Sequence, residues 1–353
     1  MTTDSIEISF LSIFSLISFF IFLFISKFSH NIKKGILLDQ DFLKPQAFHQ
    51  NAVSRSGGVA GIISLNIFFV IYYLLYSEIL YEYFFISSLL FLVGFLDDIK
   101  IKTQPILRLI LMILILIFLI YFLPIKIYNI DILFLGSFLQ NDFFSTIFVL
   151  LCFLFIINGA NLVDGFNGLL TINLIIINSI LIYVNINSGY NEFSTFLIAQ
   201  LIILISFLLF NFPRAKIFLG DSGSYLMGSL VALNSIITNN LNPNISSFFF
   251  CILLFYLFFE VFFSFMRKVL QKKSPVHPDS EHLHMLCYQR VILIFGKNKG
   301  NFINSLIINA VYLVLLIPAF YFIEDPILCR YWFFTLILIY LLIYFRLYRL
   351  TKN

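Results

Sequence analysis

Acidic and amide side chains gather in three short segments of a chain that is otherwise strongly apolar. GFLDDIK contains the adjacent pair Asp97 and Asp98, NGANLVDGFNGL contains Asn161 and Asp164, and GDSGS contains Asp221. Carboxylate and amide oxygens suit Mg²⁺. The adjacent acids of GFLDDIK repel each other and would need a divalent cation, a basic partner or a proton, unless they are simply solvated acids at a helix end near Lys100 and Lys102. The first hypothesis for these segments is therefore chemistry that combines a metal ion with phosphates.

The segment NGANLVDGFNGL carries its polar residues at helical spacing. Asn158, Asn161 and Asp164 are three residues apart and would occupy an arc of roughly 120° on a helix. Gly165 would then end the helix and let the backbone approach a ligand, with Asn167 close behind. An ordinary helix cap and turn is the alternative. The polar arc with its glycines exceeds what a cap needs, which favours a functional site.

The segment GDSGS lies at the expected start of a helix. The first backbone N–H groups of a helix have no partner within the helix, so they suit a phosphate, and Asp221 is placed to bind Mg²⁺ beside it. The simpler alternative is an N-cap in which Asp or Ser side chains accept those N–H groups. Both interpretations place this segment at a helix end.

The segment SPVHPDSEHLHM carries three of the five histidines, His277, His282 and His284. In an extended strand His282 and His284 would point the same way, and with Arg267 they could donate to phosphate oxygens. A zinc site that includes Cys287 is a weaker alternative, because the spacing matches no common zinc template. A solvated loop without a ligand is the third interpretation.

Two further polar sites are less specific. Glu260 lies seven residues before Arg267, which would place both on one helix face, so an ion pair and a catalytic role are both open. His49 and Arg55 lie in the first polar connection, and the glycines of SGGVAG follow them. These glycines could let the connection pack closely on a neighbouring element.

The composition dictates which elements position these residues. Hydrophobic residues make up 61% of the 353 and charged residues 11%, with a mean hydropathy of +0.99. Apolar runs long enough to span a bilayer recur along the chain, which predicts an all-α, polytopic transmembrane bundle of ten or eleven spans. The polar stretch 125–142 is expected to be an excursion outside the membrane. The expected spans are 9–28, 57–76, 79–96, 106–123, 143–160, 169–187, 195–211, 223–238, 246–266, 302–322 and 331–346.

The basic residues predict the orientation of the bundle. Alternate connections together with the C-terminal tail hold twenty of the 22 lysines and arginines, and the remaining two are Lys126 and Arg330. By the positive-inside rule the basic side is cytoplasmic, which puts the N-terminus outside and the C-terminus inside. All the polar segments described above then share the cytoplasmic face. Residues 1–353 are expected to form a single domain with cytoplasmic loops at 29–56, 97–105, 161–168, 211–222 and 267–301.

Four segments in this order resemble the signature regions of the polyprenyl-phosphate N-acetylhexosamine-1-phosphate transferases. They are GFLDDIK, NGANLVDGFNGL, NFPRAKIFLGDSGS and PVHPDSEHLHM. That family includes the phospho-N-acetylmuramoyl-pentapeptide transferase, and the histidine segment is more similar to the branch that starts O-antigen synthesis. The family fold, with ten or eleven helices and a cytoplasmic active site, agrees with the predicted spans.

The resemblance implies an enzyme of the bacterial inner membrane. It would use Mg²⁺, or Mn²⁺, to transfer an N-acetylhexosamine-1-phosphate from a UDP-sugar to undecaprenyl phosphate. UMP would be released, and the product would start O-antigen or a related glycan. The implied partners are the two substrates and membrane lipid, with no nucleic acid; a homodimer is left open. The alternative function is a multi-span secondary transporter. Transporters usually carry an internal repeat and acids near the bilayer midplane, and neither is evident here.

The resemblance also assigns roles by matching position. The candidate catalytic residues are Asp97, Asp98, Asp164 and Asp221, of which Asp221 and Asp98 are the candidate metal ligands. Asp97 would bind or deprotonate the lipid phosphate. Phe218 would stack on the uracil ring, and the two histidines of HLHM would hold the diphosphate. The full set of candidate substrate-binding residues is Asn161, Gly165, Asn167, Phe218, His282, His284, His49 and Arg108.

The chain departs from the family pattern at three positions. Asn167 stands where the family often has Asp, so the contact to uracil would differ because an amide can also donate. Met285 stands where a further histidine is common, and Ser280 replaces a usual basic residue. The sequence carries no legible code for the identity of the sugar.

Overall fold

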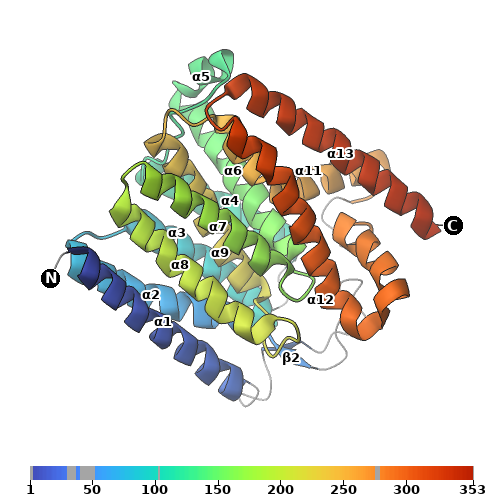
Figure 1. The fold of residues 1–353 in the computed structure, drawn as a ribbon, viewed down its shortest axis with the longest axis horizontal. Coiled ribbons are helices and arrows are strands. Elements are labelled where there is room, and N and C mark those ends of the chain that lie inside the picture. Colours follow the sequence, from blue (N-terminus) through green and yellow to red (C-terminus); the bar gives the residue numbers. More distant parts are fainter. Residues whose placement is uncertain (1–2, 30–36, 40–51, 102–103, 275–278, 353) are drawn as a thin grey trace.

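The protein is a bundle of long helices with almost no sheet (Figure 1), as seen in a computed structural model. The structure describes residues 3–29, 37–39, 52–101, 104–274 and 279–352. Its elements are α1 (Thr3–Phe28), β1 (Leu38–Asp39), β2 (Val53–Ser54), α2 (Gly57–Tyr76), α3 (Tyr81–Asp98), α4 (Pro105–Phe122), α5 (Leu133–Leu139), α6 (Asp142–Val163), α7 (Leu169–Asn187), α8 (Asn191–Asn211), α9 (Gly220–Leu241), α10 (Ser247–Leu253), α11 (Phe255–Leu270), α12 (Leu283–Tyr321) and α13 (Pro326–Lys352). The predicted all-α, polytopic membrane fold is confirmed.

Eight helices in the described part of the chain are long and apolar enough to cross a membrane. The helices α10 and α11 together form a ninth candidate span, bent by 73° at their junction. The remaining predicted spans, 79–96 and 223–238, coincide with α3 and α9, which are more polar and are not among these candidate spans. The count of eleven therefore stays a prediction, although every predicted span coincides with a helix or with the bent pair.

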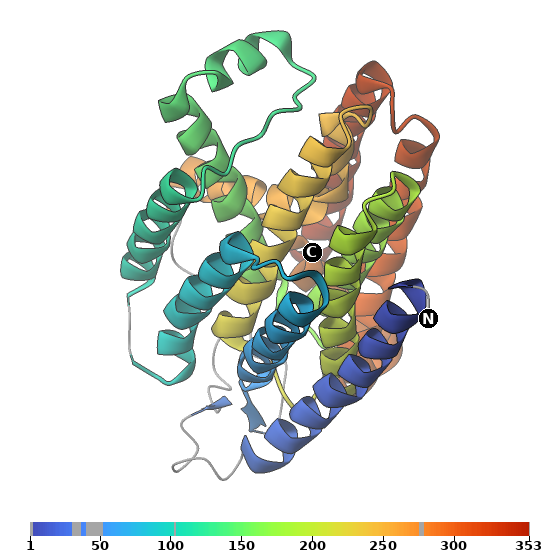
Figure 2. The same ribbon diagram turned by 90° about the vertical axis from the view of Figure 1, so that its left-hand side faces the viewer.

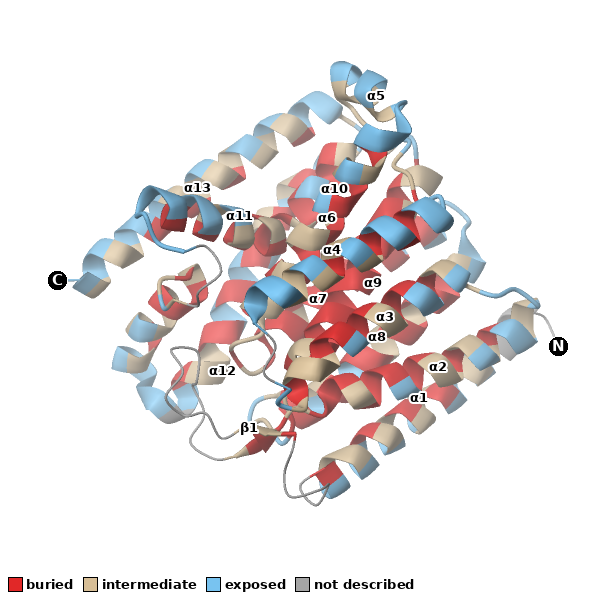
Figure 3. Ribbon diagram, turned by 180° about the vertical axis from the view of Figure 1, so that it is seen from behind, coloured by how far each residue is buried: buried red, intermediate tan, exposed pale blue. Residues whose placement is uncertain are grey.

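The helix α9 can be polar because it lies at the centre of the bundle. Eighteen of its 22 residues are buried, and it packs against α2, α3, α6 and α7. Figure 3 shows this buried core, whereas the outer faces of α1 and α13 are largely exposed. Helices at the rim face lipid and must be apolar, but a helix surrounded by protein meets no lipid and can carry Ser, Asn and Gly.

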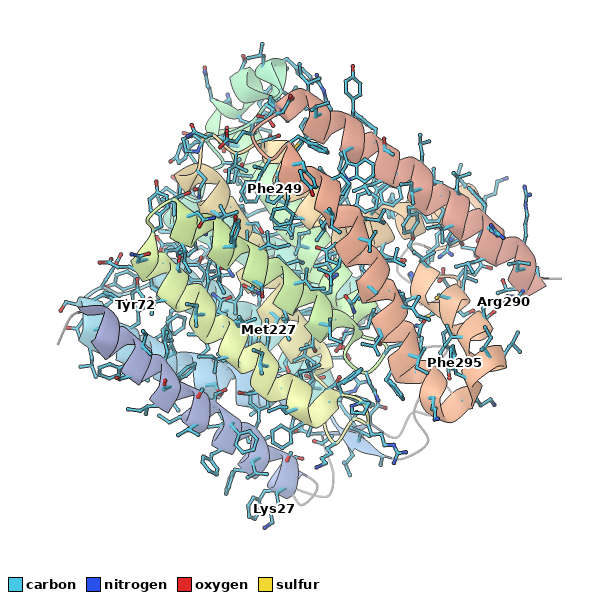
Figure 4. All side chains as sticks on the ribbon, in the orientation of Figure 1. Lys27, Tyr72, Met227, Phe249, Arg290 and Phe295 are labelled. Atoms are coloured by element: carbon cyan, nitrogen blue, oxygen red, sulfur yellow. The ribbon has the colours of Figure 1, made fainter. Side chains whose placement is uncertain are left out.

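The bundle has two distinct ends. Figure 2 shows the strands at one end and α5 at the other. In Figure 4, Lys27 and Arg290 lie toward the same end of the helices, Tyr72 and Phe249 lie toward the other, and Met227 lies between them. The end that carries the strands also contains the start of α9 and the ends of α3 and α6. Its assignment to the cytoplasm stays a prediction.

The stretch 125–142, predicted not to span the membrane, contains only the seven-residue helix α5. A carboxylate oxygen of Asp131 accepts hydrogen bonds from the hydroxyls of Ser246 and Ser247, at 2.6 and 3.0 Å, and from the backbone N–H of Phe248 at 3.3 Å. These contacts tie the excursion to the start of α10. The contacts lie at the end of the bundle away from β1 and β2.

Close helix crossings near the start of α9 depend on glycine. A Cβ atom added to Gly58 of α2 would lie 2.3 Å from the Ser222 hydroxyl oxygen and 2.4 Å from the Gly223 nitrogen. A Cβ atom added to Gly94 of α3 would lie 2.4 Å from the Asp221 carbonyl oxygen. Small residues at such crossings allow membrane helices to pack backbone against backbone. They bring α2 and α3 directly against the start of α9.

Two regions differ from the predicted loops. Within the connection between α1 and α2, β1 pairs antiparallel with β2, and Ser54 makes a parallel bridge to Ile217, which precedes α9. Much of the expected loop 267–301 is helical, because α12 begins at Leu283 and continues past a break at Gly296. The backbone at Gly296 has φ 74° and ψ 166°, a conformation that favours glycine and separates the first part of α12 from its spanning part.

The crossing at Gly58 generates a stability prediction. Gly58→Ala is expected to destabilise the protein by about 1–3 kcal/mol, because the added methyl group would overlap backbone atoms of α9. The matched control is Gly136→Ala in α5, where an added Cβ meets nothing within 4 Å. The measurement is the midpoint of thermal unfolding in detergent. Equal midpoints for both variants would contradict the close crossing.

Candidate active site

Asp98, the last residue of α3, holds the start of α9. One of its carboxylate oxygens accepts the backbone N–H of Asp221 at 3.0 Å and the other accepts that of Ser222 at 2.9 Å. The side chain is buried, at 1% exposure. Gly220 allows this approach, since its φ is +78° and a Cβ there would lie 2.6 Å from an Asp98 oxygen. A carboxylate that satisfies two N–H groups at a helix start is stabilising.

This contact changes the interpretation of GDSGS. The two N–H groups that the sequence offered to a phosphate are occupied by Asp98, so they are not free for a ligand. The simpler cap is present in a different form, because the capping carboxylate comes from α3 and no side chain adjacent in sequence caps α9. Asp98 therefore fits a structural role better than the predicted role of metal ligand.

Arg108 joins two of the candidate catalytic acids. Its Nη1 atom lies 3.2 Å from a carboxylate oxygen of Asp97 and makes a closer contact with a carboxylate oxygen of Asp221. Asp97 comes from the end of α3, Arg108 from the first turn of α4, and Asp221 from the first turn of α9. All three side chains are partly exposed. A cation between two carboxylates compensates their repulsion.

A second arginine, Arg55, connects the first loop to this cluster. Its Nη2 atom donates to Asp39 at 2.7 Å, and its Nη1 atom lies 3.8 Å from Asp98. Burial alone would lower the pKa of the Arg55 guanidinium, but the carboxylates of Asp221, Asp39 and Asp98 raise it above its ordinary value. Arg55 was only a weak candidate in the sequence analysis, and Asp39 was not a candidate. The two residues are sixteen positions apart, and no helical or strand periodicity in the sequence predicts that they pair.

Asp164 follows the last residue of α6, and its side chain is half-buried. Burial first, and then the negative charge of Asp221, raise the pKa of the Asp164 carboxyl to about 7. The helix ends just before Gly165, as predicted, and a Cβ added to Gly165 would meet nothing within 4 Å. Open space therefore borders the backbone beside Asp164, where a ligand could approach.

Amide side chains fix the loop that follows Asp164. The backbone N–H of Asn167 donates to the Asn301 side chain at 2.8 Å, and the Asn167 amide donates to the Pro213 carbonyl at 3.0 Å. The Gly168 N–H donates to the Asn211 side chain at 2.7 Å. Asn167, predicted to meet uracil, thus anchors the loop to α12 and to the segment that precedes α9.

Asn161 and Phe218, two further residues predicted to bind the UDP-sugar, lie close to α9. Asn161 donates from its amide to the hydroxyl of Ser224 at 3.0 Å, which ties α6 to the first turn of α9. Phe218 lies two residues before α9 and is half-buried. Its backbone N–H donates to Ser54 at 2.8 Å, and its carbonyl accepts from Gly57 at 2.9 Å. The structure thus brings both residues to the same end of the bundle as the aspartates.

The histidine segment adopts a buried arrangement. His282 and His284 are 3% and 0% exposed, and their rings lie parallel, as expected for alternate residues of an extended segment. Of the two interpretations left open for Glu260, the ion pair with Arg267 is not the arrangement that the structure shows. Glu260 contacts His282 at 3.3 Å, whereas Arg267 pairs with Asp279 at 2.7 Å. His49 and His277 lie outside the described residues.

The cluster offers oxygen ligands at its exposed side. Among the residues that the structure describes, no three His, Cys, Asp or Glu side chains come together in a way that could hold a metal ion. Magnesium usually takes only one or two carboxylates and completes its shell with water and substrate phosphates. The partly exposed carboxylates of Asp221 and Asp97 fit that requirement, while both oxygens of Asp98 are occupied.

Comparison with known proteins supplies independent information. The model of the family described as glycosyl transferase family 4 matches residues 79–239. An undecaprenyl-phosphate alpha-N-acetylglucosaminyl 1-phosphate transferase of Thermotoga maritima is 29% identical over 280 residues, covering 78% of this chain and 80% of the relative. A phospho-N-acetylmuramoyl-pentapeptide-transferase of Dictyoglomus turgidum is 32% identical over 234 residues, covering 63% of this chain and 73% of the relative. The chain belongs to glycosyl transferase family 4.

Other relatives match a shorter part of the chain. A phospho-N-acetylmuramoyl-pentapeptide-transferase of Clostridium perfringens is 33% identical over 109 residues, which is 31% of this chain and 34% of the relative. The region matched by glycosyl transferase family 4 contains Asp97, Asp98, Asp164 and Asp221. It ends before α10, so the histidine segment lies outside it.

The contact between Asp98 and α9 predicts a stability effect. Asp98→Asn would replace one acceptor by an NH₂ group and leave a backbone N–H of α9 without a partner, at a cost of about 1–3 kcal/mol. Asp97→Asn is the control, because the ion pair of Asp97 with Arg108 is partly exposed. Thermal unfolding in detergent measures both. If Asp98→Asn is no less stable than Asp97→Asn, Asp98 does not hold the helix.

The raised pKa of Asp164 predicts a dependence of stability on pH. An acid whose pKa rises on folding binds more protons in the folded state, so its contribution to stability is lost as the pH rises from about 4 to about 7. Asp164→Asn removes that loss. The variant is expected to unfold at a higher temperature than the wild type at pH 8, with a smaller difference at pH 5. A pH-independent difference would contradict the burial of this carboxyl.

Proposed function

We propose that this protein transfers an N-acetylhexosamine-1-phosphate from a UDP-sugar to undecaprenyl phosphate and releases UMP. The observation that carries the proposal is the meeting of Asp97, Asp164 and Asp221 at one end of the bundle, with Arg108 between two of them. Phosphoryl transfer requires positioning and charge neutralisation more than covalent help from the protein. Acids for a metal and an arginine for phosphate supply both.

The relatives support the choice of acceptor. The name of the Thermotoga maritima relative includes undecaprenyl phosphate as its substrate, and that of the Dictyoglomus turgidum relative describes transfer of a phosphorylated sugar-peptide. Membership of the same family extends a phosphate-transfer reaction on a lipid carrier to this chain. The donor class and the role in starting O-antigen or a related surface glycan rest on the four matching sequence segments.

An apolar cavity supports a lipid substrate. It has a volume of about 400 Å³ and lies among α6, α9, α10 and the segment that precedes α5. Its lining is almost entirely apolar, with Cys152, Phe155 and Ile236 among the contributing residues. The cavity lies toward the end of α9 remote from the aspartates. A polyprenyl chain whose phosphate sits among those acids would run along the bundle in this direction.

The proposed reaction is a direct displacement at phosphorus. An oxygen of the lipid phosphate attacks the phosphorus that bears the sugar, and a new P–O bond forms. The bond from that phosphorus to UMP breaks, and its electron pair leaves with the UMP oxygen. Asp97 is proposed to bind or deprotonate the lipid phosphate, whose second ionisation lies near pH 6 and therefore needs only a weak base.

The other residues are proposed to bind and orient the donor. Asp221 would hold Mg²⁺, which would neutralise charge on the phosphates when bound. Arg108 would pair with phosphate oxygens once the substrates replace its contacts with the acids. Phe218 is assigned to the uracil ring, and the loop after Asp164 to the nucleotide. A transporter would place its acids near the bilayer midplane, whereas these acids lie at helix ends.

The experiment is a transfer assay with a panel of donors. Membranes that contain the protein are incubated with undecaprenyl phosphate, Mg²⁺ and each UDP-N-acetylhexosamine, and the lipid product is identified by mass spectrometry. One or more donors are expected to yield a sugar linked to the lipid by a diphosphate, and EDTA is expected to prevent it. Absence of product with every donor would overturn the proposed function.

Asp221→Asn tests the metal assignment within this assay. The variant is expected to lose at least about a hundredfold in rate, since an amide binds Mg²⁺ more weakly than a carboxylate does. Asp142→Asn is the matched control, because Asp142 is exposed at the other end of the bundle and pairs only with Lys126. Full activity of Asp221→Asn in equal amounts of membrane-inserted protein would remove the metal ligand from the proposal.

A further inference from the structure

A buried acid outside the aspartate cluster has no part in the proposed reaction. Glu260 lies in α11 at 1% exposure. A carboxylate without partners in such a position would be strongly unfavourable, so its surroundings show how its charge is satisfied. Its hydrogen-bond partners come from the start of α12 and from α13.

Three donors converge on the Glu260 carboxylate. One oxygen lies 3.3 Å from Nδ1 of His282, and the other accepts the Leu283 backbone N–H at 3.1 Å and the Tyr340 hydroxyl at 3.0 Å. His282 and Leu283 form the start of α12, and Tyr340 belongs to α13. Glu260 therefore joins α11 to the first turn of α12 and to the last helix, and it fixes the position of His282.

The two nitrogens of His282 both face carboxylates. Nδ1 lies 3.3 Å from Glu260, and Nε2 lies 3.4 Å from Asp279. The hydrogen bond between Nδ1 and Glu260 sets the orientation of the His282 ring. The His284 ring lies parallel to it at a centroid distance of 5.4 Å, and burial lowers the pKa of His284 to about 4.

Residues of α12 also pack against the loop that follows Asp164 and hydrogen-bond to it. The Phe166 ring packs edge-on against His284, with centroids 5.8 Å apart. On the same helix, Asn304 donates to the His284 carbonyl at 3.0 Å, and Asn301 accepts the Asn167 backbone N–H at 2.8 Å. A displacement at the start of α12 would therefore move the residues that directly follow Asp164.

We propose that Glu260 is a positioning residue for the transfer reaction. It touches no substrate. It holds the His282 ring beside the donor phosphates and fixes the turn of α12 against which the loop 164–168 packs. In the structure the carboxylate of Asp279 faces the second nitrogen of His282. The same carboxylate pairs with Arg267 at 2.7 Å and lies 3.7 Å from Nζ of Lys268. A phosphate oxygen can take the place of that carboxylate oxygen, while Glu260 keeps the ring in position. This inference rests on the proposed function.

Glu260→Gln tests the proposal with little change of shape. Glutamine keeps one acceptor oxygen for the Leu283 N–H, but it replaces the oxygen that faces Nδ1 of His282 by an NH₂ group, which donates. The rate of transfer per folded protein is expected to fall about 10- to 100-fold, the loss typical when a residue that orients a functional imidazole is replaced. The Michaelis constant for the UDP-sugar is expected to rise. Tyr340→Phe, which removes one donor and leaves the charge, is the matched control with a smaller expected loss.

A double-mutant cycle separates positioning from a general effect on folding. If Glu260 acts through His282, then Glu260→Gln should add little to the loss already caused by His282→Asn. A residue that only supports the fold would lower the thermal midpoint and leave turnover per folded molecule unchanged. Any loss of transfer rate that it caused independently of His282 would multiply with the loss caused by His282→Asn.

The outcomes distinguish this inference from the function on which it rests. An active wild type with an equally active Glu260→Gln variant would overturn the inference alone, as would fully multiplicative losses in the cycle. A wild type that transfers no sugar phosphate from any donor would overturn the proposed function and the inference with it. A loss of transfer rate in Glu260→Gln that is absent when His282→Asn is already present supports both the proposed function and this inference.

Discussion

The arrangement of the site depends on the Asp98 carboxylate accepting the first two N–H groups of α9 that need a partner. This contact fixes the end of α3 against the start of α9, and it sets where the neighbouring residues point. Asp97 directly precedes Asp98, and Asp221 supplies one of the two N–H groups that Asp98 accepts. Their carboxylates meet at Arg108 because the two helix ends are joined in this way. The adjacent aspartates of the DD pair thus serve two purposes, one structural and one directed to the open side.

The polar centre is possible because the bundle shields it from lipid. Ser, Asn and Gly make up ten of the 22 residues of α9, and α2 and α3 approach it at glycines closely enough for their backbones to touch. Small residues at such crossings let membrane helices approach closely, and van der Waals packing stabilises the contact. Rim helices such as α1 provide the apolar exterior. The site is therefore placed at the end of a polar core and not on the outside of an apolar one.

Much of this could be predicted from local patterns. Apolar runs located the spans, and acidic or amide residues at helix ends located Asp97, Asp164 and Asp221. The residues that pattern analysis missed pair across long distances in sequence. Asp39 with Arg55 and Glu260 with His282 are examples, and neither pair has a period that a helix or strand would impose. Spacing correctly predicts that Glu260 and Arg267 could share a helix face, but each finds a better partner on the segment that leads into α12.

The polarity of α9 also affects how the chain enters the membrane during synthesis. A helix rich in Ser, Asn and Gly gains little from contact with lipid, so it is poorly retained by the bilayer alone. The helices α2 and α3, whose glycines receive it, precede it in the chain and are available when it emerges from the ribosome. Insertion of α9 is then a docking event onto protein already in place, and the glycines that permit the close crossing also set the order of assembly.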